Sequence, residues 1–265
     1  MTRRDDLPTE IQISEAELTV MTRELDDIHN DSMSQVRENM AGVADRIASV
    51  TRTVANRRTF LLGGAAVVGG AALAACGGSS SGGTKSSSGG TTGGGSSPYM
   101  GDLKVVALAA ALENLAVAGY GLVLKSAGKG KYGKVPPAIA QFATTVQKQH
   151  SDHAASWNSV LSNAGVPKVT GTPLTIAAPS VKALQDAKSL PAVASVALGL
   201  ENAAAETYVF AAANVTDPGG IANAATIAPV EAMHAAILSF VLGKYPVPNS
   251  DIGISNAVQP SALTA

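Results

Sequence analysis

Four long stretches of the chain carry apolar residues at helical spacing, separated by segments rich in Gly, Pro and polar residues. They run from about Leu103 to Ala127, Pro136 to Asn163, Pro191 to Ala213 and Pro218 to Gly243. Each would form a helix of about 35–40 Å at a rise of about 1.5 Å per residue. The connections are short, long and short, and the long one contains a shorter helical stretch at 180–188. The pattern predicts an all-α protein, an antiparallel four-helix bundle with one long crossover between helices two and three.

The chain before the bundle divides by composition. Residues 1–55 are polar and acidic, with heptad-like apolar positions between Leu18 and Ile47 but no strong core face. A frayed helix, a disordered leader and sequence upstream of the true start all remain open for this polar segment. The further predicted segments are a signal-like stretch at 56–76, a Gly/Ser/Thr linker at 77–98, the bundle at 99–248 and a C-terminal tail at 249–265.

The stretch at 56–76 has the order of an export signal. Arg57 and Arg58 precede an apolar run of 16 residues, and Cys76 follows it directly. The run is shorter than the roughly 20 residues that span a bilayer. The arginine pair resembles a twin-arginine signal, and Leu-Ala-Ala before Cys76 resembles a bacterial lipobox, in which the cysteine is lipidated. This predicts export and anchoring in the membrane through Cys76, on the extracytoplasmic face of the cell envelope. An uncleaved anchor helix with an incidental cysteine is the alternative.

Charge and cysteine content exclude other classes of protein. All eight arginines lie before residue 59, and from Cys76 onward eleven lysines stand against nine Asp and Glu. A nucleic-acid partner would require clustered basic residues, so none is expected. The single cysteine excludes an internal disulfide and any Cys-based zinc or iron–sulfur site.

An internal repeat places glutamate, tyrosine and histidine residues at equivalent positions in the two halves of the predicted bundle. Leu-Glu-Asn, with a tyrosine seven residues after the glutamate, occurs at Glu113 with Tyr120 and again at Glu201 with Tyr208. His-Ala-Ala occurs in both the second and the fourth helix. This register sets the pair Glu231-x-x-His234 opposite His150-x-x-His153, and residues three apart share one helical face.

The repeat places three histidines and three glutamates on the predicted inward stripe. Burying three carboxylates without a compensating charge costs several kcal/mol each, so a divalent metal is predicted. The alternative is that these groups face solvent or form hydrogen bonds with no ion. The candidate ligands are Glu113, His150, His153, Glu201, Glu231 and His234, with Tyr120, Tyr208 and Gln147 expected beside them; Gln147-x-x-His150 is a second register.

The arrangement resembles the ferritin-like superfamily, particularly exported bacterial ferritin-like domain proteins, over about residues 100–245. That superfamily has one Glu from each of two helices plus Glu-x-x-His from the other two, and here His150 replaces one glutamate. The resemblance implies one or two transition-metal ions, iron first with manganese or zinc as options, and oxygen or peroxide redox chemistry. Imidazole at position 150 would shift the preference toward zinc, copper or a single iron. Enzymatic activity stays open. The alternative is a non-enzymatic cell-surface bundle that is structural or binds a partner, and a homo-oligomer is an option.

Overall fold

The computed structural model describes residues 7–8, 10–47, 49 and 97–265. The predicted signal segment, with Arg57, Arg58 and Cys76, lies outside the described residues. The helices are α1 (Glu15–Met40), α3 (Asp102–Gly128), α4 (Pro137–Asn163), α5 (Ala177–Asp186), α6 (Leu190–Asn214) and α7 (Pro218–Val241), followed by the short 3-10 helix η1 (Pro260–Ala262). Within these residues no strand forms, and the one isolated bridge joins Leu174 to Leu263.

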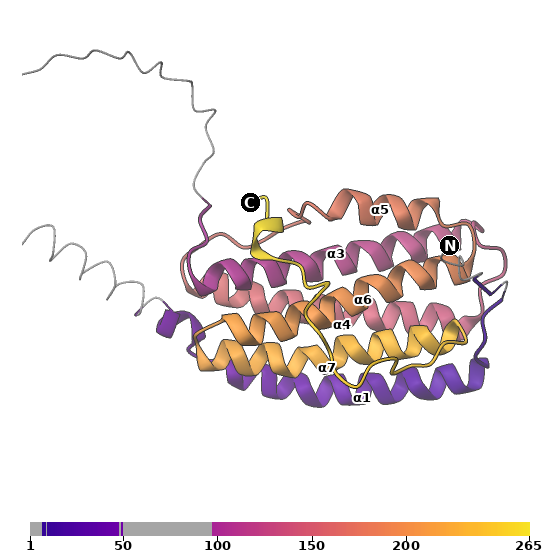
Figure 1. Cartoon of the computed structure of the whole chain (residues 1–265), viewed down its shortest axis with the longest axis horizontal. Coiled ribbons are helices and arrows are strands. Elements are labelled where there is room, and N and C mark those ends of the chain that lie inside the picture. Colours follow the sequence, from indigo (N-terminus) through magenta and orange to yellow (C-terminus); the bar gives the residue numbers. More distant parts are fainter. Residues whose placement is uncertain (1–6, 9, 48, 50–96) are drawn as a thin grey trace, which may run out of the picture.

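Two antiparallel hairpins, α3 with α4 and α6 with α7, build the bundle (Figure 1). The crossover from α4 to α6 contains α5, which packs on α3 and α6. The start of α7 follows from its sequence: Asp217 caps the helix by accepting a hydrogen bond from the Gly220 N–H at 3.0 Å, and Pro218 occupies the first turn. The predicted all-α bundle with one long crossover is confirmed.

Helix α1 lies within residues 1–55, where a polar leader was predicted with a frayed helix among the options, and it has a core face that the sequence pattern did not indicate. It packs along α4 and α7 on the side of the bundle away from α5. Leu18, Leu25 and Val36 are each at most 2% exposed. After the helix, Arg46 Nε donates to Asp217 Oδ2 at 2.6 Å, which ties this segment to the cap of α7. The sequence pattern looked weak because the buried stripe is narrow and includes a threonine and a histidine, as in a coiled-coil seam.

Two helices are almost uniformly apolar. By length and composition α3 and α7 could each cross a membrane, although 61% of the most apolar stretch of each is buried inside the bundle. A helix that is apolar all round is expected at the centre of a bundle, because it has neighbours on several sides. The apolar surfaces of α3 and α7 are therefore used in packing against the other helices of the bundle.

Candidate metal centre

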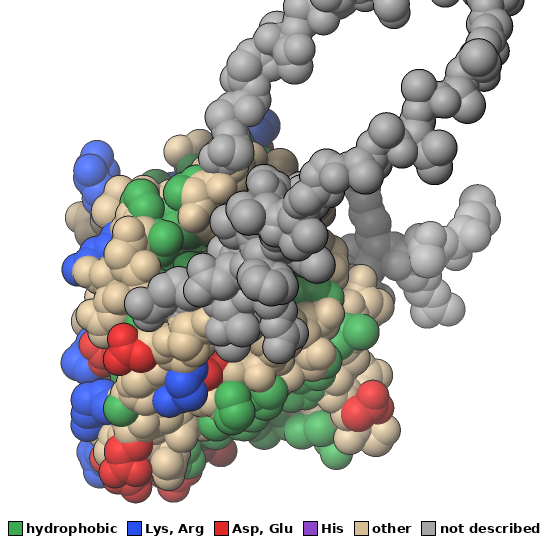
Figure 2. Space-filling view, turned by 90° about the vertical axis from the view of Figure 1, so that its left-hand side faces the viewer, with side chains coloured by type: hydrophobic (Ala, Val, Ile, Leu, Met, Phe, Trp, Pro, Cys, Tyr) green, Lys and Arg blue, Asp and Glu red, His purple; other side chains and the backbone are tan. Residues whose placement is uncertain are grey.

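All six candidate ligands lie together in the middle of the bundle. Glu113 comes from α3, His150 and His153 from α4, Glu201 from α6, and Glu231 and His234 from α7. Each of these residues is at most 2% exposed. Among the described residues, no histidine is visible on the face of the molecule in Figure 2.

The six side chains form two overlapping groups of four. Glu113, His150, His153 and Glu231 form one group, and His150, Glu201, Glu231 and His234 form the other; within each, the potential ligand atoms lie within 4.8 Å of one another. Glu231 belongs to both groups. Its Oε1 is 3.1 Å from His153 Nδ1, and its Oε2 is 3.3 Å from His234 Nδ1. One carboxylate therefore faces both halves of the site.

His150 is the second shared residue, and it stands where the ferritin-like pattern has a glutamate. Its Nδ1 lies 2.7 Å from Glu113 Oε2, and its Nε2 lies 3.3 Å from Glu201 Oε1. The two ring nitrogens thus point toward opposite halves, as the two oxygens of a bridging carboxylate would. The substitution keeps the bridging position but exchanges a negative group for one that is neutral or positive.

The two tyrosines cross between the hairpins. The Tyr120 hydroxyl on α3 donates to Glu201 Oε1 on α6 at 2.6 Å, and the Tyr208 hydroxyl on α6 donates to Glu113 Oε1 on α3. Trp157 Nε1 donates in turn to the Tyr208 hydroxyl at 2.9 Å. Each tyrosine therefore orients the glutamate of the opposite hairpin, as groups around metal ligands commonly do.

Charge within the site is balanced by its own residues. Burial lowers the pKa of His150, but the charges of Glu231 and Glu201 and the hydrogen bond with Glu113 raise it well above 6.5. Burial also lowers the pKa of His153, but its negative neighbours, mainly Glu113, outweigh burial and raise the pKa to about 9. Burial raises the pKa of Glu113, but the surrounding histidines outweigh this effect and lower the pKa to about 2. Protonated histidines can thus compensate the buried glutamates, so charge alone does not require a metal, contrary to the sequence argument.

Two atoms of the first group test whether a metal fits. His153 Nδ1 and Glu231 Oε1 are buried and 3.1 Å apart, but neither has a hydrogen-bond partner of suitable geometry. Buried polar atoms are normally satisfied, so such a pair needs an explanation. An imidazole nitrogen and a carboxylate oxygen that lie this close together form a donor set that suits zinc, iron or manganese.

The glutamine beside the site is Gln149 and not Gln147. Gln147 lies against α3, where its Nε2 donates to the Val117 carbonyl at 3.0 Å. Gln149 Oε1 lies 2.8 Å from His234 Nε2, and Gln149 Nε2 donates to Asp26 Oδ1 at 3.3 Å. A chain of contacts therefore runs from α1 through Gln149 to a candidate ligand, and it orients the His234 ring.

His29 on α1 is a further residue of the site that sequence reasoning missed. It is fully buried, its ring centroid is 5.1 Å from that of His153, and its Nε2 lies 3.3 Å from Asp152 Oδ2. Burial and the neighbouring His153 lower the pKa of His29 to about 4. Its sequence position could have indicated burial, because His29 follows Leu18 by eleven residues and Leu25 by four and so lies on the apolar stripe of α1.

A family model described as a ferritin-like domain matches residues 97–244, more than half of the chain. The match spans α3 to α7 and leaves α1 outside. Searches of the curated proteins and of the solved structures found no match. Together with the bundle and its buried His/Glu cluster, the match shows that the chain belongs to the ferritin-like family.

Proposed function

We propose that this protein binds one or two transition-metal ions through Glu113, His150, His153, Glu201, Glu231 and His234. The observation that carries the proposal is the buried pair of His153 Nδ1 and Glu231 Oε1, which lie close together without a hydrogen bond. Iron is the first candidate in a ferritin-like fold, while the three imidazoles also suit zinc and the three carboxylates also suit manganese.

When bound, iron or manganese would supply oxygen or peroxide redox chemistry, whereas zinc would not. The protein's own residues would hold the ligands in place, through the hydrogen bonds of Tyr120 and Tyr208 to the glutamates and of Gln149 to His234. The buried apolar surroundings of α3 and α7 would keep water from the site.

The second candidate is a non-enzymatic bundle with no functional metal. The observation that favours it is the charge balance of the site, because Glu113 and Glu201 already have protonated histidines as partners. In that case the His/Glu network would fix the packing of the four helices and nothing more.

Elemental analysis of the purified full chain distinguishes the two candidates. After reconstitution with iron, manganese or zinc and removal of loose metal, we expect one to two ions per chain for at least one of these metals. Less than about 0.2 ion per chain with all three would overturn the proposal, because a built site retains its metal.

We further propose that the chain is exported and held on the extracytoplasmic membrane face through lipidated Cys76. The order of arginine pair, apolar run and cysteine supports this. Cleavage before Cys76 would break the covalent link between α1 and the bundle. In the mature protein α1 would then be held only by noncovalent contacts with α4 and α7.

Mass spectrometry of the protein from membranes of an expressing bacterium tests this anchoring. We expect a mature chain that begins at lipid-modified Cys76, and a Cys76→Ala variant that is not lipidated. A membrane-free chain that retains residues 15–40 would contradict the proposal.

A further inference from the structure

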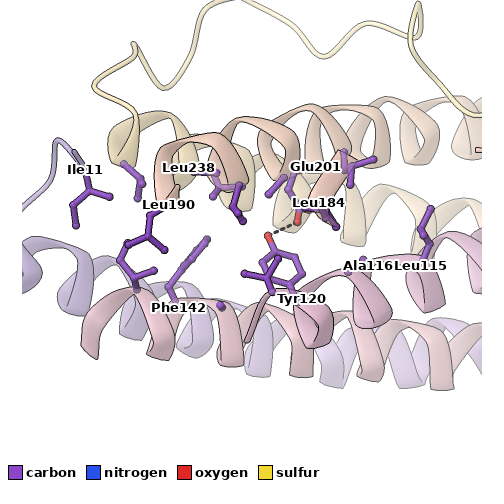
Figure 3. Close-up of a pocket in the computed structure, with 18 residues that line it drawn as sticks. Ile11, Leu115, Ala116, Tyr120, Phe142, Leu184, Leu190, Glu201 and Leu238 are labelled. Carbon is purple, nitrogen blue, oxygen red and sulfur yellow. Dashed lines mark hydrogen bonds between the residues drawn. The ribbon is translucent and has the colours of Figure 1, made fainter. Parts of the chain in front are cut away.

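The six candidate ligands are at most 2% exposed, so a metal ion must pass through the packed bundle to reach them. An apolar cavity of about 80 Å³ between the two hairpins is unsuited to an ion, because its wall is apolar except for Tyr120 and Glu201, which are hydrogen-bonded to each other (Figure 3). A second cavity touches Glu113, His150 and Glu201 but has only about 30 Å³. Such a volume holds about two waters at roughly 10–15 Å³ each, so a hydrated ion does not fit it.

A third opening, a groove of about 760 Å³ between α1 and α4, is lined mostly by polar residues. Asp152 on α4 lines it with a side chain that is 37% exposed, and Arg37 and Lys148 are the other charged residues of the lining. Helix α1 makes the surroundings negative, because residues 15–40 carry seven Asp and Glu against two Arg. A negative surface raises the local concentration of cations.

Asp152 connects this groove to the buried side of α1. Its Oδ2 lies 3.3 Å from Nε2 of His29, which is fully buried, and the His29 ring centroid lies 5.1 Å from that of His153. The Nδ1 atom of His29 has no hydrogen-bond partner among the described residues, which is unusual for a buried polar atom. A surface carboxylate, a buried imidazole and a candidate ligand therefore follow one another from solvent to the site.

The spacing of these groups suits stepwise ligand exchange. Carboxylate oxygens and imidazole nitrogens bind transition metals at about 2.0–2.2 Å, so two ligand atoms that share one ion lie at most about 4.2 Å apart. The contact between Asp152 and His29 is within this distance. The His29 and His153 rings are close enough for a small rotation to bring one nitrogen of each within it. An ion could thus move inward while keeping a protein ligand at each step.

Lys148 competes with an entering cation at the first step. Its Nζ donates to the same Oδ2 atom of Asp152 at 2.7 Å, so the ammonium group occupies the position that a metal ion would take. Both side chains reach solvent, and exposed ion pairs of this kind open easily. Lys148 should therefore slow entry without blocking it, and its removal should have the opposite effect to the removal of Asp152.

We propose that divalent transition-metal ions enter through this groove, with Asp152 as the first ligand and His29 as the ligand that passes the ion to His153. Helix α1 lies outside the ferritin-like match, so this path is an addition to the shared fold. The proposal rests on the proposed function, because the path leads to that site. An ion leaves by the path through which it enters, so these residues should change the rates of uptake and release equally and leave the final metal content unchanged.

Timed uptake by the metal-free full chain tests the path. The chain is mixed with zinc(II), or with anaerobic iron(II) if zinc does not load, stopped at intervals with excess EDTA, desalted and measured by elemental analysis. Asp152→Asn and His29→Leu should each slow uptake by at least about fivefold, and Lys148→Gln should speed it by at least about twofold, because local charge and ligands control the entry of cations. The final metal content of all three variants should equal that of the wild type.

The matched controls are Lys182→Gln and Asp186→Asn, which change an equivalent i,i+4 ion pair on α5 with a distance of 2.6 Å. Both should take up metal at the wild-type rate. If His29→Leu does not fold, the variants of the exposed pair Lys148 and Asp152 still make the test.

Unchanged uptake by Asp152→Asn, or no acceleration in Lys148→Gln, would overturn the path and leave the proposed function standing. A lower final metal content in Asp152→Asn would also overturn it, because Asp152 would then hold the bound ion and not only pass it on. A wild-type chain that retains less than about 0.2 ion of either metal would overturn the proposed function and the path together.

Discussion

Replacing Glu231 by Gln should remove metal from both halves of the proposed site while the bundle stays folded. The change preserves size but removes the charge and one acceptor oxygen from the carboxylate that faces both His153 and His234. We expect less than about 0.2 ion per chain under conditions that load the wild type, because metal binding needs deprotonated, anionic or neutral ligands. The measurement is elemental analysis after equilibration at equal free metal.

The same variant should lose the stabilisation that metal gives. A ligand at about 100 times its Kd stabilises the native state by about 2.7 kcal/mol. For a domain of this size, that corresponds to a rise in Tm of about 5–10 °C. The matched control is Glu206→Gln on α6, where the carboxylate accepts hydrogen bonds from Asn256 outside the site. It should load metal as the wild type does. Equal metal content in the Glu231 variant and the wild type would mean that Glu231 is not a ligand.

Without metal, the protein should lose stability as the pH rises from about 6.5 to 9. The folded-state pKa of His153 is about 9, above its ordinary 6.5, so its contribution is fully present below 6.5 and is lost as the pH rises through 9. One pKa unit corresponds to about 1.4 kcal/mol, so His153 alone would contribute about 3 kcal/mol. For Glu113 the folded-state pKa is about 2 against 4.5, so its contribution is present above 4.5 and is lost as the pH falls through 2. His29, with a folded-state pKa of about 4, destabilises the fold as the pH falls below 6.5, so the metal-free protein should be most stable near pH 6.5.

Bound metal should change the alkaline side of this profile. Histidine ligands must lose their protons to bind, so the stabilisation by metal grows as the pH rises. Thermal melts of metal-free and metal-loaded protein should diverge above pH 6.5, and His153→Gln should flatten the alkaline slope of the metal-free curve. A metal-free Tm that does not change between about pH 6.5 and 9 would contradict the charge pairing in the site.

The four helices of the bundle could be predicted because each carries a strong local signal. Pro218 after Asp217 marked the start of α7, and long apolar stretches marked α3 and α6. The core face of α1 was missed because its buried stripe is narrow and its other faces are charged. Only the packing against α4 and α7 shows that this stripe is a core face.

The six candidate ligands could be located because the internal repeat places equivalent residues in both hairpins. Asp26 and His29 could not, because their place at the site depends on the packing of α1 against α4 and α7. Gln149 could not either, because its contact with His234 depends on how α4 and α7 pack. The choice of Gln147 over Gln149 rested on its spacing from His150. In the structure, the Gln147 side chain instead donates a hydrogen bond to the Val117 carbonyl of α3.

Anomalous X-ray diffraction from crystals of the full chain loaded with iron or zinc tests the metal centre most directly. We expect one or two peaks in the middle of the bundle, the first among Glu113, His153 and Glu231 and the second among Glu201, Glu231 and His234. Peaks only on the protein surface, or none within the bundle, would show that these six residues form a hydrogen-bonded core and not a metal site.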